Sequence, residues 1–177
     1  PKLRVGVIGL GVGAKHAEAV VRIPECELAA VCDTNPMALA AVAGKFPGAV
    51  ACDRDTDILE DPSIDLVCIA SYDDCHFSQT LLALERGKHV FVEKPFVLHE
   101  AEARQVREQL RGRPDLRLSS NLILRRSPRF LDLPQRILAG QFGTLYHLDA
   151  EYNYGRLEKI TGGWRGKLPF YSAVHGG

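Results

Sequence analysis

A glutamate and a lysine stand together in the apolar stretch VFVEKPFV, residues 90–97. A strand this apolar normally excludes charge, because an unpaired ion taken out of water is costly. At a strand end, Lys94 could hold a substrate hydroxyl and help move its proton, and Glu93 could orient that lysine. Pro95 biases Lys94 away from helical geometry, which restricts where the ammonium group points. The alternative is a salt-bridged strand end that a proline terminates.

A second group of residues is suited to binding a dinucleotide. The stretch VGVIGLGVGAKHA has a G-x-G-x-x-A pattern between a strand-like run and a helical pattern. Gly9 permits the tight turn, Gly11 lets a pyrophosphate approach the backbone, and Ala14 lets the helix pack close to the strand. Amides and the helix dipole at this start attract phosphates. The predicted cofactor loop comprises Gly9, Leu10, Gly11, Val12 and Ala14.

Asp33 stands about twenty residues after the glycines, at the end of the second strand-like run. A carboxylate there accepts hydrogen bonds from the adenosine ribose and repels a 2′-phosphate. The following residues supply no arginine or lysine for such a phosphate. We therefore predict NAD as cofactor, with NADP left open. The alternative role for Asp33 is a cap for the helix beginning near Pro36, which Thr34 or Asn35 could supply equally well.

Short runs rich in valine and isoleucine alternate with helical patterns along the first two thirds of the chain. The predicted strands are 3–9, 27–33, 49–52, 65–71, 89–94 and 116–122. The predicted helices are 14–23, 35–46, 75–87 and 99–112. This alternation predicts an α/β fold, a doubly wound parallel sheet of the Rossmann type, over residues 1–120.

Ligands of such a sheet bind outside the carboxyl ends of its strands. Glu93 and Lys94 end the fifth predicted strand, so we place both at the cofactor crevice rather than in the core. Asn121 ends the sixth strand, where it could contact the nicotinamide or the substrate. Its alternative role is that of a turn residue.

The pattern changes after Asn121. A helical segment at 127–140 precedes an alternating run at 143–155, which favours an open, mostly antiparallel sheet. We interpret residues 121–177 as the beginning of an α/β domain that is incomplete in this sequence.

Composition narrows the classes of partner. The 22 basic and 22 acidic residues balance, which gives no electrostatic reason to expect nucleic acid or a membrane as the main partner. No apolar run approaches the ~20 residues of a membrane-spanning helix. The five cysteines lack metal-ligand spacing, so we predict no metal site and expect buried free thiols in a reducing, cytoplasmic environment. Because the sequence begins at Pro1, an N-terminal targeting segment is not strictly excluded.

The chain resembles the glucose-fructose oxidoreductase and inositol dehydrogenase family (Gfo/Idh/MocA) over essentially its whole length. The resemblance lies in VGVIGLGVGAKHA, IASYDDCHFSQTLLALERGKHVFVEKPF, NLILRRSPRF and GQFGTLYHLDAEYNYG, and the Glu-Lys-Pro triplet is its most specific part. It implies a Rossmann domain followed by a domain with a large open sheet, through which a homo-oligomer forms. It also implies hydride transfer between NAD(P) and a sugar, polyol or related small alcohol, with Lys94 as the catalytic residue.

The family pattern also implies roles for residues after the fourth strand. Ser71 and His76 carry over as cofactor-side residues, whereas Tyr72 and Asp73 depart from the usual Thr-Pro-Asn-x-x-His pattern. The family's Asp and His for proton transfer follow a Gly-Gly pair, and this sequence stops at such a pair, residues 176–177. The alternative function is that of a dinucleotide-binding, non-catalytic sensor or truncated protein. A methyl-donor-binding domain is a third interpretation, but it gives the Glu-Lys-Pro triplet no purpose.

Overall fold

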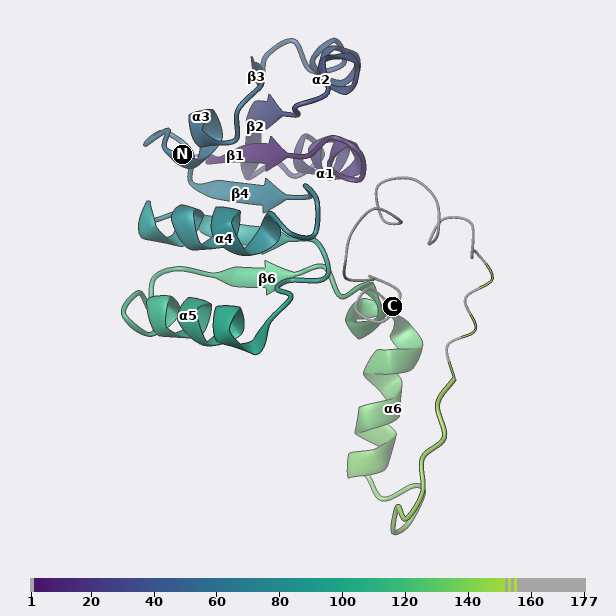
Figure 1. The fold of residues 1–177 in the computed structure, drawn as a ribbon. Coiled ribbons are helices and arrows are strands. Elements are labelled where there is room, and N and C mark those ends of the chain that lie inside the picture. The colour runs from purple at the N-terminus through teal and green to yellow at the C-terminus, as the bar shows by residue number, and fades with distance from the viewer. Residues whose placement is uncertain (1, 152, 154, 156–177) are drawn as a thin grey trace. The chain divides into compact units, whose positions relative to one another are not determined.

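The computed structural model describes residues 2–151, 153 and 155, and the chain divides after Asn121 into two compact units. Strands and helices alternate in the first unit (Figure 1). Its strands are β1 (Leu3–Ile8), β2 (Cys26–Cys32), β3 (Val50–Cys52), β4 (Leu66–Ile69), β5 (His89–Val92) and β6 (Leu118–Ser120). Its helices are α1 (Gly13–Val20), α2 (Pro36–Ala43), α3 (Thr56–Leu59), α4 (His76–Glu85) and α5 (Glu100–Arg111).

The six strands form one sheet in the order β3-β2-β1-β4-β5-β6, and every neighbouring pair is parallel. The order reverses between β1 and β4, where doubly wound sheets bind their ligands at the carboxyl ends of the strands. The structure confirms the predicted Rossmann-type α/β fold.

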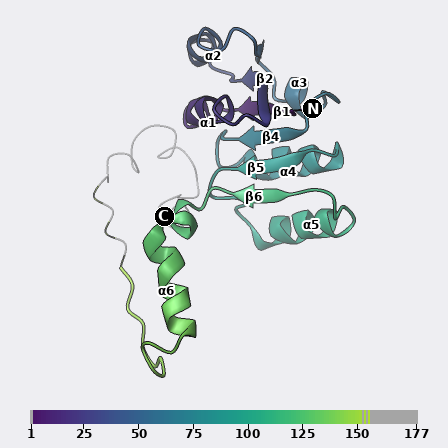
Figure 2. The ribbon, with the colours of Figure 1, turned by 180° about the vertical axis from the view of Figure 1, so that it is seen from behind.

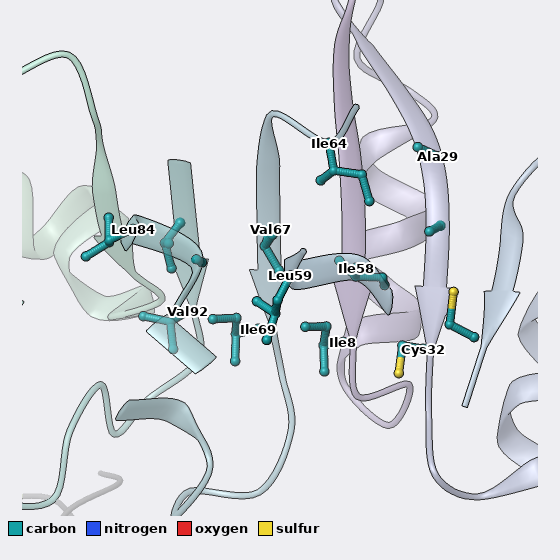
Figure 3. Close-up of a cluster of buried hydrophobic side chains, with 14 of the residues drawn as sticks. Ile8, Ala29, Cys32, Ile58, Leu59, Ile64, Val67, Ile69, Leu84 and Val92 are labelled. Atoms are coloured by element: carbon teal, nitrogen blue, oxygen red, sulfur yellow. The ribbon is translucent and has the colours of Figure 1, made fainter. Parts of the chain in front are cut away.

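Both faces of the sheet are covered, so its apolar strands are buried on two sides. One core cluster joins the sheet to α3, α4 and α5 through Ile58, Leu84 and Val106 (Figure 3). The other joins it to α1 and α2 through Ala17 and Val42. Helices α4 and α5 lie in front of the sheet in Figure 1 and behind it in the opposite view of Figure 2. Because neighbouring strands of this packed sheet are parallel, their carboxyl ends lie on the same side of it.

Local signals set several helix ends. Asn35 is the N-cap of α2, and its side chain accepts from the amides of Met37 and Ala38. Gly87 follows α4 in the left-handed region, with a φ of +77°. The four-residue helix α3 was missed, because so short a helix has no apolar period to detect.

The second unit begins at Leu122. It contains the 3₁₀ turn η1 (Ile123–Arg126) and helix α6 (Pro128–Leu138), in the region where a helix was predicted. Residues 145–151 form no strand, because a strand needs a partner strand and the described part of this unit offers none. The rest of the alternating run, and the tail after it, lies largely outside the described residues, so the antiparallel sheet stays a prediction.

The five cysteines are free thiols, and Cys32, Cys52 and Cys68 are buried, as predicted. Burial raises the pKa of Cys32 and of Cys68 to about 12. Within the described ranges, no helix combines the length and apolar character needed to cross a bilayer.

Candidate cofactor and active site

The glycine loop connects β1 to α1 at the carboxyl edge of the sheet. Gly9 has a φ of +83°, and a Cβ there would collide with the carbonyl group of Ala70. Gly11 is exposed, and no protein atom lies within 4 Å of the position that its Cβ would take. The fold therefore requires a glycine at position 9, whereas position 11 leaves the open space that an approaching pyrophosphate needs.

The start of α1 also fits a phosphate-binding role. No side chain caps this helix at Val12, and its first turn carries no acidic residue. A Cβ on Gly13 would lie 3.1 Å from Val7 Cγ1 and 3.3 Å from Ala70 Cβ. The close approach of helix and strand therefore falls at Gly13, one residue before Ala14, to which the sequence pattern assigned it. Ala14 is half-buried and packs against the core cluster under α1.

Asp33 follows β2 and ties the loop to the strand end. The Leu10 amide donates to Asp33 Oδ2 at 2.7 Å, and the Asn35 amide donates to Asp33 Oδ1 at 2.8 Å. Asn35, rather than Asp33, caps α2, so the alternative role considered for Asp33 falls to its neighbour. Each carboxylate oxygen retains a lone pair, so a fixed, half-buried acceptor lies next to the glycine loop, as an adenosine ribose requires.

Glu93 lies just beyond β5, and its carboxylate joins three segments. His16 Nε2, from α1, lies 2.8 Å from Glu93 Oε1. Asn121 Nδ2, just beyond β6, donates to the same oxygen at 2.7 Å. The side chains of His16 and Glu93 are only 16% and 12% exposed. The charge in the apolar stretch is therefore satisfied by partners from elsewhere in the fold.

These contacts decide the charge of Glu93. Burial pushes the pKa of this carboxyl group upward, but hydrogen bonds from His16 and Asn121, with the nearby His16 charge, hold it below its ordinary value of 4.5. Glu93 is therefore an anion at neutral pH and is not a proton donor there.

The segment after Glu93 is held from a second side. The Lys94–Pro95 peptide bond is cis, and Lys94 is half-buried. His76 Nδ1, at the start of α4, lies 2.7 Å from the Pro95 carbonyl oxygen, and its Nε2 lies 3.2 Å from that of Ser71. His76 is 1% exposed, so this ring links the loop after β4 to the segment after β5.

Ser71 belongs to a further polar chain at this edge. Its hydroxyl donates to Gln79 Oε1 at 2.6 Å, and Gln79 Nε2 donates to Asp55 Oδ2 at 2.7 Å. Gln79 is buried, so this series of hydrogen bonds holds the loop after β4 in place. The contacts of Ser71 and His76 are thus with protein groups that shape this edge, and their part in cofactor binding stays a prediction.

The predicted residues of the first unit therefore lie together at the carboxyl ends of the strands. The loop follows β1, Asp33 follows β2, Ser71 follows β4, the Glu93–Lys94 pair follows β5, and Asn121 follows β6. Their roles toward a ligand remain predictions.

Sequence reasoning missed two residues at this edge, Gly13 and His16. The sequence gives His16 no role, because its contact with Glu93 spans 77 positions. The usable signal was its place in the first turn of the helix after the glycine loop, since that turn lies at the same edge as the strand ends. Among the described residues, no cluster of three histidine, cysteine or carboxylate side chains could hold a metal ion.

Comparison with known proteins agrees with this geometry. The model of an oxidoreductase family with an NAD-binding Rossmann fold, GFO_IDH_MocA, matches residues 3–119. The chain is 30% identical over 142 residues to myo-inositol 2-dehydrogenase of Thermotoga maritima, covering 80% of this chain and 42% of that protein. It is 34% identical over 95 residues to D-xylose 1-dehydrogenase (NADP(+)) of Hypocrea jecorina, covering 54% of this chain and 24% of that protein.

Solved structures show the same relationship. The crystal structure of scyllo-inositol dehydrogenase from Lactobacillus casei, with bound NAD(H) and scyllo-inositol, superposes with a TM-score of 0.73 at 26% identity. The match covers 81% of this chain and 43% of that one. The chain thus spans less than half the length of these relatives. Its matched region, its sheet and its glycine loop agree: the chain belongs to the Gfo/Idh/MocA oxidoreductase family, whose Rossmann fold binds NAD.

Proposed function

We propose that this chain is the cofactor-binding part of a dehydrogenase that transfers a hydride between NAD(P) and a sugar, polyol or related small alcohol. The observation that carries the proposal is the arrangement of the Glu93–Lys94 segment, which follows β5 at the same sheet edge as the glycine loop and Asp33. The names of relatives that act on inositol and xylose support the substrate class.

Each residue has a distinct proposed role. The amides at the start of α1 bind the pyrophosphate, with Gly11 leaving room for it. Asp33 accepts from the adenosine ribose. Lys94 holds the substrate hydroxyl through Nζ and takes part in moving its proton. Bound NAD supplies the hydride acceptor. Asn121 and Glu93 hold the Lys94 segment in place beside it.

Asp33 also bears on the choice of cofactor. Its fixed carboxylate would repel a 2′-phosphate, so we propose NAD rather than NADP, although one relative's name specifies NADP(+). The free thiols suit a cytoplasmic location. The proposed partners are a small sugar-like substrate and, through the second domain, further copies of the protein.

The test is a screen of the native gene product against sugars and polyols, with NAD and NADP in parallel. We expect NAD to raise the melting temperature, and one of these alcohols to be oxidised with reduction of NAD. If NAD stabilises the protein but no alcohol supports turnover, the non-catalytic alternative is correct. If S-adenosylmethionine stabilises it and NAD does not, the protein is a methyl-donor-binding domain instead.

A further inference from the structure

Lys94 is flanked in the chain by two residues that histidines hold from opposite sides. On one side, the Glu93 carboxylate contacts His16 Nε2 at 2.8 Å and Asn121 Nδ2 at 2.7 Å. On the other side, the Pro95 carbonyl oxygen lies 2.7 Å from His76 Nδ1. Side chains from α1, from α4 and from the residue after β6 therefore hold the two neighbours of a single lysine.

The orientation of His16 is itself restricted. Its ring meets the Phe91 ring edge to face, with centroids 5.3 Å apart and planes at 86°. Phe91 belongs to β5, two positions before Glu93. The histidine thus packs against the same strand whose end it contacts by hydrogen bonding. A ring fixed on two sides can set where the Glu93 carboxylate lies, rather than follow it.

We propose that His16 is a positioning residue, which acts through Glu93 to hold Lys94 in a fixed position relative to α1. His16 lies in the same short helix whose first amides are assigned to the pyrophosphate, only three positions after Gly13. Binding of the phosphates at the start of α1 and placement of Lys94 are therefore mechanically linked through one carboxylate. This inference rests on the proposed function, since it assigns to Lys94 a position that matters for the reaction.

The test compares variants of the native gene product by the rate at which Lys94 is acetylated, measured by peptide mass spectrometry. His16→Phe keeps the packing on Phe91 but removes the contact with Glu93, and Glu93→Gln removes the charge. We expect each to raise the Lys94 rate about threefold or more, the scale set by one hydrogen bond. The double variant should be no faster than Glu93→Gln alone, because His16 acts through Glu93.

Three controls separate positioning from general loosening. Glu18→Gln removes an ion pair with Lys15 on the same helix and should leave the Lys94 rate unchanged. His16→Gln provides a hydrogen-bond donor again, so its Lys94 acetylation rate should lie between those of His16→Phe and the wild type. Lys45, which is exposed and distant in the chain from Glu93, should react equally in wild type and in the His16 and Glu93 variants.

The turnover readout separates this inference from the proposed function. In an active protein, His16→Phe should lower kcat about tenfold, with a smaller change in the KM for NAD. If the native protein has no turnover, the proposed function fails, but the acetylation rates still decide the positioning role. An unchanged Lys94 rate in His16→Phe, or additive effects in the double variant, would overturn the inference.

Discussion

Asp33 combines a structural role with a proposed role in cofactor binding. Its two oxygens accept hydrogen bonds from the amides of Leu10 and Asn35. The acceptor proposed for the ribose therefore also holds the glycine loop against the end of β2. Spacing along the sequence predicts a carboxylate here. It does not predict the bond to Leu10, because that bond depends on how the loop folds back over the strand.

We therefore expect Asp33→Ala to weaken both stability and cofactor binding. Loss of two amide partners should cost about 1–3 kcal/mol of unfolding free energy, and NAD affinity should fall about tenfold or more. Urea unfolding and NADH titration measure the two effects. Thr34→Ala, at an exposed neighbouring position, is the control and should change neither. An Asp33→Ala protein with wild-type stability would contradict the anchoring role.

The Glu93 carboxylate makes stability depend on pH. Burial disfavours its ionisation, but the hydrogen bonds from His16 and Asn121 outweigh burial and lower its pKa below 4.5 in the folded state. A carboxyl group with a lowered folded pKa stabilises the protein above its unfolded pKa, and that contribution is lost as the pH falls through the folded value.

Glu93→Gln should therefore flatten the acid side of the stability curve. The difference in unfolding free energy between wild type and variant should be largest near neutral pH and should shrink as the pH falls below 4.5. Urea unfolding over a pH series measures it. A constant difference at every pH would show that folding does not lower the pKa of Glu93, which would contradict the effect assigned to its hydrogen bonds.

At the scale of elements, the alternation of strands and helices was enough to predict the sheet, because buried parallel strands and their covering helices have distinct apolar periods. The predicted ends differ from the observed ones by a few residues; the fifth strand, for example, ends at Val92 rather than at Lys94. Contacts between elements, such as His16 with Glu93, could not be predicted, since period says nothing about which side chains meet across β4.

The loop between β1 and α1 gives a matched pair of variants. Gly9→Ala forces a side chain into the left-handed region and against the Ala70 carbonyl, so it should cost about 1–3 kcal/mol of stability. Gly11→Ala meets no protein atom, so it should fold normally and instead weaken NADH binding. Thermal unfolding and NADH titration of both proteins check this. Equal stability losses at the two positions would contradict the division of roles.

A buried lysine lies at the amino end of β5, on the side of the sheet opposite to the candidate site. Lys88 is 2% exposed, and its Nζ donates to the carbonyl oxygens of Asp61 and Ile64. Lys88→Met keeps much of the volume but leaves the Ile64 carbonyl without its ammonium donor and the Asp61 carbonyl with only the Ile64 amide, which should cost about 1–3 kcal/mol. Lys45→Met, at an exposed site, is the control for urea unfolding. If both variants unfold alike, Lys88 contributes nothing beyond its packing.

At the scale of the whole molecule, the chain divides between a sheet with both faces covered and a second unit that begins at Leu122. All the predicted cofactor residues belong to the first unit, which is also where the family model matches. Since the chain spans less than half of its relatives, the complete reaction is a property proposed for the native protein.

The most direct test of the central claim compares the native gene product with its Lys94→Ala variant, using the alcohol that best supports NAD reduction. The account predicts that kcat falls about a hundredfold or more, as loss of a proton-transfer group does, while the NADH dissociation constant changes by less than about threefold. Full turnover in the variant would contradict the catalytic role of Lys94. Loss of NADH binding in step with turnover would instead make Lys94 a cofactor-binding residue alone.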